Sequence, residues 1–237
     1  MFASSTFVYV NNLKCAAAIL ALGGKPRQTD FVTRVTKATE TKETTSFWFE
    51  PITKKGEKVH DLAAAFSYLA RGPKGPLRAS TASILNNADH LIHFCFDVLK
   101  ERDEIHTCFL SAMAAGDKLK PDPSQFRTSN TKIATMLVTN GFHMEDYGLN
   151  ETGQCEYAFI PTPTLLQYVE AYESPELLLK DDDHKVYYAK ACLEQREACL
   201  YWKNKATPYI YKMQAGKHLL IPTNATPETL AKCQAYL

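Results

Sequence analysis

The sequence lacks a membrane-spanning segment and the familiar catalytic signatures. No apolar run approaches the roughly 20 residues that a helix needs to cross a bilayer. The patterns G-x-S-x-G, H-E-x-x-H, C-x-x-C and G-x-x-x-x-G-K-[ST] are also absent, and these mark many hydrolases, zinc enzymes, redox proteins and nucleotide-binding enzymes. We therefore expect no membrane contact, no cofactor and no bound metal, and we favour a binding protein over an enzyme.

Cysteine is scattered rather than arranged in pairs. The chain has seven cysteines, an odd number, and most of them lie among apolar neighbours in segments with helical spacing. A thiol in such a place acts as a small hydrophobic group. The first ten residues also lack the basic region and the long apolar region of a secretory signal. We therefore expect reduced thiols in a cytoplasmic protein.

Charge is nearly balanced overall but unevenly distributed along the chain. The net charge is +1. Residues 1–80 contain 12 Lys and Arg against 6 Asp and Glu, whereas residues 81–180 contain 7 against 14. Residues 181–237 are again basic, with 8 against 6. A polyanion would be attracted to the two ends of the chain and repelled by its middle.

Hydrophobic spacing predicts a mixture of helices and hairpins. Alternating apolar and polar residues predict β hairpins over 31–49, 142–160 and 209–221. Helical spacing predicts helices over 13–22, 59–69, 131–139, 164–172 and 187–203. The long apolar stripe of 81–115 is interrupted at 100–104, which predicts two helices or one bent helix. Thr226 and Pro227 are expected to begin a final helix.

We assign the chain to the α+β class, as a framework of helices and β hairpins split by an insertion. Residues 1–78 and 185–237 are both basic and both combine short helices with hairpins, so we expect them to form one framework. Residues 79–184 are an acidic, mainly helical insertion in this scheme. Residues 71–78 contain two prolines and two glycines and are the best candidate for a linker.

The insertion has the element order of a winged helix. Within 83–161, two helices precede a third at 128–139, and the hairpin at 142–160 follows as the wing. Two features argue against binding to duplex DNA, because the turn at 116–127 is long and the region is strongly acidic. For this winged-helix-like insertion we therefore favour protein contacts, or a plain helical insertion, over duplex recognition.

Three terminal segments resemble small, uncharacterised phage- and plasmid-encoded proteins. They are LKCAAAILALGG at 13–24, TSFWFEP at 45–51 and KATPYIYKMQAGKHLLIPTNATPE at 205–228. In that group a strand, a helix and a hairpin at the start precede a helix, a hairpin and a helix at the end. The resemblance implies an α+β protein of a phage or another mobile element, acting in the host cytoplasm. It covers the outer half of the chain and implies no activity or site residue.

Aromatic and basic residues are interleaved in both terminal regions. Such interleaving is typical of proteins that bind single-stranded nucleic acid, because cations contact phosphates while flat rings stack on bases. The candidate binding residues are Arg34, Lys37, Trp48, Trp202, Lys203, Tyr211 and Lys212. The alternative is that the rings belong to the core and the lysines form an ordinary solvated surface.

The leading hypothesis is therefore a non-catalytic, nucleic-acid-binding accessory protein. A second hypothesis is an interaction or structural protein, whose acidic insertion contacts a basic partner or a second copy of this chain. A hydrolase is a third, because catalytic residues from distant segments leave no local pattern. His90, His93 and Cys95 have a spacing compatible with zinc, but a core cysteine beside surface histidines is the favoured interpretation.

Overall fold

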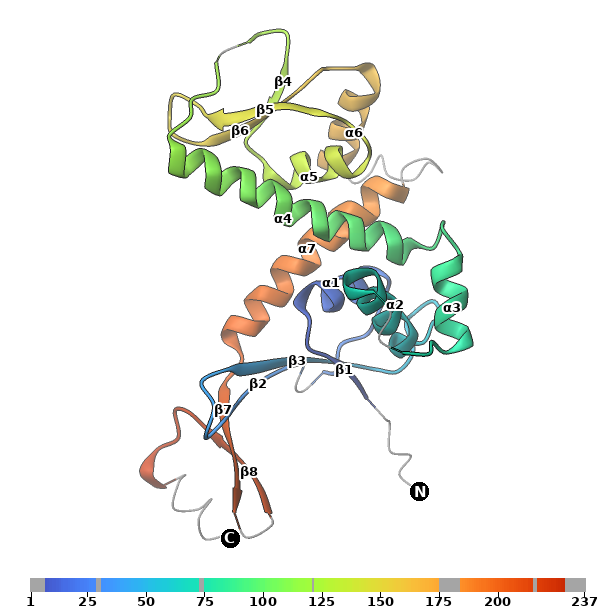
Figure 1. The fold of residues 1–237 in the computed structure, drawn as a ribbon, viewed down its shortest axis with the longest axis vertical. Coiled ribbons are helices and arrows are strands. Elements are labelled where there is room, and N and C mark those ends of the chain that lie inside the picture. Colours follow the sequence, from blue (N-terminus) through green and yellow to red (C-terminus); the bar gives the residue numbers. More distant parts are fainter. Residues whose placement is uncertain are drawn as a thin grey trace.

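The computed structural model shows a mixed α+β protein, which confirms the predicted class (Figure 1). It describes residues 7–28, 31–72, 75–120, 122–174, 184–214 and 217–228. The helices are α1 (Leu13–Ala21), α2 (Val59–Arg71), α3 (Ala79–Asn86), α4 (Leu91–Ala115), α5 (Thr131–Thr139), α6 (Pro163–Glu173) and α7 (His184–Lys205). The strands are β1 (Val8–Val10), β2 (Val32–Lys37), β3 (Glu43–Phe49), β4 (Phe126–Thr128), β5 (Met144–Leu149), β6 (Cys155–Phe159), β7 (Pro208–Gln214) and β8 (Lys217–Pro222).

A five-stranded sheet joins strands from both ends of the chain. Its order is β1-β3-β2-β7-β8, and only the contact between β2 and β7 is parallel. The two terminal hairpins, β2–β3 and β7–β8, are those that the alternating residues predict. Their junction is a parallel pairing that runs from Arg34 opposite Pro208 to Lys37 opposite Tyr211. This pairing places residues from the two ends of the chain side by side.

The core of this sheet lies on one face of β3. Phe47 and Phe49 are fully buried and share a core cluster with the alanines of α1. The small side chains of Ala16, Ala17 and Ala18 let this helix pack closely, and all three are fully buried. Because side chains alternate along a strand, Trp48 points to the opposite face of the sheet.

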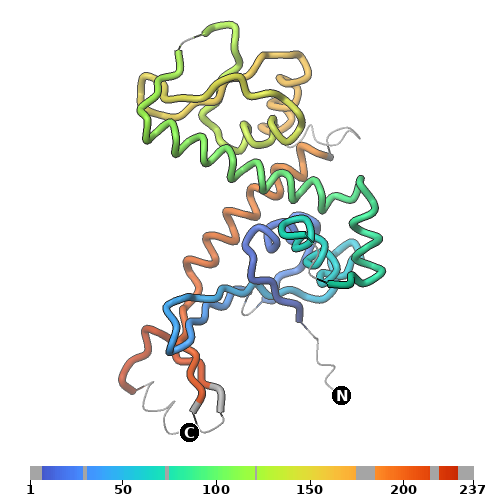
Figure 2. The backbone as a smooth tube through the Cα atoms, in the orientation of Figure 1, coloured from blue at the N-terminus to red at the C-terminus, as the bar shows by residue number. Residues whose placement is uncertain are grey.

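The smaller sheet lies on the other side of α4 from the five-stranded sheet (Figures 1 and 2). Its order is β4-β6-β5, and both pairings are antiparallel. The β5–β6 hairpin and α5 are confirmed predictions. Strand β4 was not predicted, because its first residues were expected to belong to a loop. Helices α4 and α7 contact each other between the two sheets. No helix among the described residues is long and apolar enough to cross a membrane.

The stretch 81–115 contains two helices, α3 and α4, which is one of the two predicted alternatives, but the predicted position of the break at 100–104 is wrong. The chain leaves the helical conformation at 87–90 instead, and α4 continues through the charged run. Lys100 and Glu104 are one turn apart on the exposed side and form an ion pair of 3.2 Å, which supports the helix rather than ending it. The start of α4 is set by His90, whose Nδ1 accepts a hydrogen bond from the Ile92 N–H at 3.1 Å.

The winged-helix interpretation stays a prediction. The order of helix, helix and hairpin is present, but residues 116–130, which include β4, separate α4 from α5. A helix-turn-helix pair needs a turn of about three or four residues, so α4 and α5 do not form one. Pro227 and Glu228 are helical, as expected for the start of the final helix, and the rest of that predicted helix lies outside the described residues.

A tight turn after α1 brings the chain back to β3. Gly24 donates its N–H to the Ile19 carbonyl at 2.8 Å, and the Arg27 N–H then donates to the Trp48 carbonyl at 2.9 Å. A Cβ atom at position 24 would overlap Ile19 Cγ2 and lie 2.8 Å from the Ile19 carbonyl oxygen. Only glycine fits this close approach, so the turn fixes the segment that carries Arg27.

We expect Gly24→Ala to lower the free energy of unfolding by about 3 kcal/mol, the upper end for overpacked sites. Gly56→Ala is the matched control, because Gly56 has a φ of +85° but a Cβ atom added there would have no neighbour within 4 Å. In the control, the free energy of unfolding falls only by the cost of placing alanine in a left-handed backbone conformation, about 1 kcal/mol. Urea unfolding measures both variants, and equal losses would contradict the close approach at Gly24.

Candidate functional site

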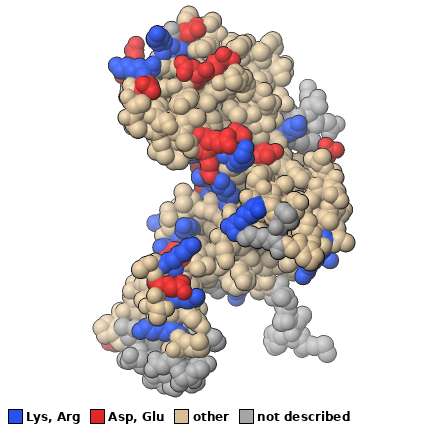
Figure 3. Space-filling model, viewed as in Figure 1, with Lys and Arg blue, Asp and Glu red and all other residues tan. Residues whose placement is uncertain are grey.

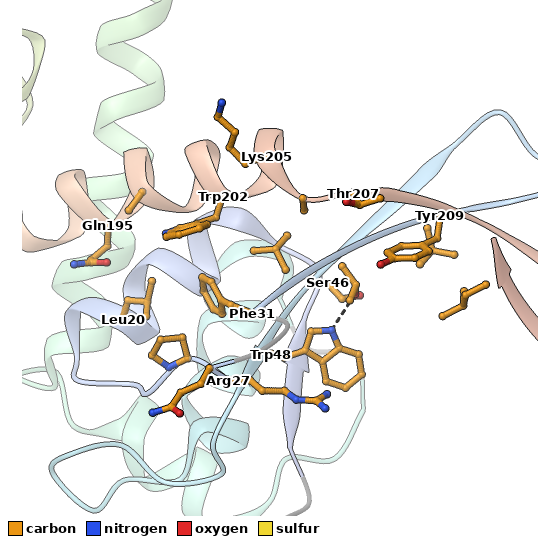
Figure 4. Close-up of a pocket in the computed structure, with 18 residues that line it drawn as sticks. Leu20, Arg27, Phe31, Ser46, Trp48, Gln195, Trp202, Lys205, Thr207 and Tyr209 are labelled. Carbon is orange, nitrogen blue, oxygen red and sulfur yellow. Dashed lines mark hydrogen bonds between the residues drawn. The ribbon is translucent and has the colours of Figure 1, made fainter. Parts of the chain in front are cut away.

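A groove of about 870 Å³ lies where α7 meets the five-stranded sheet (Figure 4). It exists because β7 pairs with β2 only from Arg34 onward. Upstream of that point, the edge of β2 faces the last turns of α7 instead of another strand, and Val32 and Thr33 line the groove. Its volume falls within the range of about 300–1,000 Å³ that is typical of small-molecule sites.

One face of α7 forms a wall of the groove. Its lining residues Gln195, Ala198, Trp202 and Lys205 follow one another at intervals of three, four and three residues, so they share one side of the helix. Trp202 is 53% exposed and projects from α7 toward Phe31 and Leu20 (Figure 4). The Tyr201 ring contacts it edge-on, with centroids 5.5 Å apart. The Trp202 ring is therefore partly supported and accessible.

Trp48 lies farther along the groove, near Ser46 (Figure 4). Its indole N–H donates to Thr33 Oγ1 at 2.9 Å. The Tyr9 ring packs against it with centroids 5.1 Å apart. These two contacts, from β2 and β1, fix the orientation of the indole ring before any ligand arrives.

The charged lining of the groove is positive. Arg27 lines the groove from the turn after α1, and Lys205 lines it at the end of α7, with its ammonium pointing away from Trp202 (Figure 4). The Arg27 guanidinium lies 4.7 Å above the Phe7 ring, and the Lys205 ammonium lies 5.8 Å from the Tyr201 ring. As far as the described residues go, no Asp or Glu lines the groove. The site therefore combines flat rings with an environment that favours anions.

Comparison of the chain with protein-family models, curated proteins and solved structures finds no match.

The structure brings together only part of the residue set predicted from the sequence. Trp48 and Trp202 line the same groove, although they belong to opposite ends of the chain. Lys203, Tyr211 and Lys212 are not among the lining residues. Lys203 on α7 and Tyr211 on β7 are half-buried, and Lys212 on β7 is exposed.

Arg34 has a structural role at this site. Its Nε lies 2.9 Å from both carboxylate oxygens of Glu43. One terminal nitrogen also donates to the carbonyls of Lys203 and Ala206, both at 3.4 Å. Arg34 therefore ties the end of α7 to the β2–β3 hairpin and does not line the groove.

Lys37 is engaged in a local ion pair on the exposed turn of the hairpin. Its ammonium lies 2.8 Å from Glu40 Oε1. This hydrogen bond raises the pKa of Lys37, and the negative charge of Glu40 adds to the effect. Lys37 thus stays charged, but the negative charge of Glu40 beside it weakens its attraction for another anion.

Arg27, Phe31 and Gln195 were missed by the sequence analysis. Gln195 could have been found from its helical spacing to Trp202. Arg27 and Phe31 could not, because Arg27 reaches the groove through a turn. Phe31 precedes β2, where that chain segment pairs with β3 but not yet with β7.

The described residues offer little for nucleophilic or metal chemistry. No group of three or more His, Cys, Asp or Glu side chains in the described ranges is arranged to hold a metal ion. Burial raises the pKa of the Cys15 and Cys199 thiols to about 12, so these two groups are not thiolates near neutral pH.

We expect Arg34→Ala to lower the free energy of unfolding by about 1.5–3 kcal/mol, the range for hydrogen bonds to charged groups. Lys37→Ala is the control on the same strand, and we expect no measurable change because its pair is exposed. Urea unfolding of both variants measures the difference. The structural role of Arg34 is wrong if the two variants are equally stable.

Proposed function

We propose that the protein binds single-stranded nucleic acid through this groove, without catalysis. The observation that carries the proposal is the convergence of Trp48 and Trp202, from opposite ends of the chain, on one groove with Arg27 and Lys205. Stacking of a base on an aromatic side chain contributes about 1–3 kcal/mol and requires little sequence preference. The two cations favour the phosphates of the same strand.

The shape of the site favours a single strand over a duplex. In a duplex the faces of the bases are covered by their neighbours, so the Trp48 and Trp202 rings can stack only on unpaired bases. The acidic residues also disfavour a long duplex footprint, because acidic side chains gather over α4 on the face shown in Figure 3. A strand is therefore directed to the five-stranded sheet and away from the middle of the chain.

The biological setting is part of the same proposal. The described cysteines are free thiols, which supports a cytoplasmic location. Service to a phage or another mobile element rests on the resemblance of the terminal segments. A protein-interaction role for the acidic insertion remains the competing hypothesis.

We expect Trp202→Ala to weaken binding of a labelled single-stranded oligonucleotide by roughly 5- to 150-fold, the equivalent of one lost stacking contact. Tyr187→Ala is the matched control, since Tyr187 is an exposed ring (50%) near the start of the same helix and outside the groove. Fluorescence anisotropy at fixed salt measures both variants. Equal affinities for the two variants, or no binding by the wild-type protein, would contradict the proposal.

The salt dependence tests the phosphate contacts separately. We expect Lys205→Ala to reduce the slope of log K against log salt by about 0.7, the value for one phosphate contact on a single strand. Lys185→Ala, an exposed lysine at the other end of α7, should leave the slope unchanged. Self-association in size-exclusion chromatography with no response to oligonucleotide would instead favour the interaction hypothesis.

A further inference from the structure

The face of the five-stranded sheet that points away from the α1 core carries aromatic side chains on three strands. Tyr9 on β1 is the register partner of Trp48 on β3, and Val35 on β2 is the partner of Tyr209 on β7. Partners that lie opposite each other in neighbouring strands point to the same face of a sheet. Thr33, which accepts the Trp48 indole N–H, is two residues before Val35 on β2, so both pairs share this face.

The accessible part of this face extends beyond the groove. Trp48 and Tyr209 line the groove (Figure 4), whereas Tyr9 is not among the described residues that line it. The Tyr9 ring packs against Trp48 at an interplanar angle of 42°, yet Tyr9 is 56% exposed. Exposed apolar surface that continues from a groove marks a site for a ligand or a partner. The ring surface open to a ligand therefore reaches the β1 edge of the sheet.

The three rings span the sheet diagonally. Strands β3 and β2 lie between β1 and β7, and the registers offset Tyr209 from Trp48 by about four residues along the strands. With about 4.8 Å between strands and about 3.3 Å per residue, Tyr9 and Tyr209 are roughly 19 Å apart. Nucleotides stacked in a duplex strand follow one another about every 3.4 Å, and unstacked nucleotides are farther apart. Roughly six nucleotides at most therefore cover this distance.

The arrangement of this face suits unpaired bases better than a protein partner. Thr33 and Ser46 are partners of each other and lie between Trp48 and Tyr209. The rings are thus separate platforms rather than one continuous apolar patch, which the centre of a protein interface would need. Some proteins that bind single-stranded RNA use spaced rings on a sheet face in this way, to stack two or three bases.

Resting on the proposed function, we infer that the bound strand continues from the groove across the open face of the sheet to Tyr9. Tyr9 is then a further base-stacking residue, at the β1 end of the path, and Trp48 lies within the path. The contacts are with the faces of bases, so they select an unpaired strand without selecting a particular base.

Nitration of tyrosine side chains by tetranitromethane, followed by peptide mass spectrometry, tests this path on the full chain. A saturating single-stranded oligonucleotide should protect Tyr9 from nitration. Tyr187 is the matched control, because it is similarly exposed (50%) but lies near the start of α7 and outside the groove. Its nitration should not change. Equal nitration of Tyr9 with and without the bound strand would overturn the path.

Substitutions at Tyr9 test the ring itself. Tyr9→Leu keeps an apolar contact with Trp48 but has no flat face, so it should weaken oligonucleotide binding by roughly 5- to 150-fold, the loss of one stacked base. Tyr9→Phe keeps the ring and should bind like the wild type. Equal affinities for these two variants would overturn the stacking role of Tyr9. Circular dichroism spectra show whether each variant remains folded.

The length of the strand separates this inference from the proposed function. Affinity for oligothymidylates should rise up to about six nucleotides, the length that covers the path. Affinity that is already maximal with a dinucleotide, and that Trp202→Ala but not Tyr9→Leu weakens, would overturn the path and leave binding in the groove intact. No binding of any oligonucleotide by the wild-type protein would overturn both.

Discussion

The parallel pairing of β2 with β7 is the contact on which the groove depends. It joins the two ends of the chain in one sheet and covers only Arg34 to Lys37 on β2. Upstream of Arg34, α7 takes the place of the neighbouring strand, and the space between the helix and the strand edge becomes the groove. A pairing that began earlier on β2 would close this space, and the Arg34 contacts with Glu43 and α7 stabilise the observed junction.

Local elements of the fold could be predicted from the sequence, but their partners could not. The bounds of α5 and the two terminal hairpins follow from periodicity, because spacing reports which side chains share a face. The β2–β7 pairing has no local signature, since alternation does not indicate which strand lies alongside. Strand β4 has only three residues, too few for alternation to be visible. The charged run in α4 was misjudged because its i,i+4 ion pair stabilises the helix.

The candidate site was predictable to a similar extent. The two tryptophans stand out in the sequence and line the same groove in the structure. Two of the predicted basic residues, Arg34 and Lys37, do not line the groove. Each has a carboxylate partner within the same hairpin. A count of basic residues ignores such partners. Arg27 replaces them at the groove, and it is placed there by the tight turn at Gly24.

Photochemical crosslinking of a single-stranded oligonucleotide, with the crosslinked residues identified by mass spectrometry, is the most direct test of where a strand lies. We expect crosslinks on two segments distant in sequence, β3 around Trp48 and the end of α7 around Trp202, with few on α4. Crosslinks gathered on α4 or α5, or spread evenly over the surface, would contradict it.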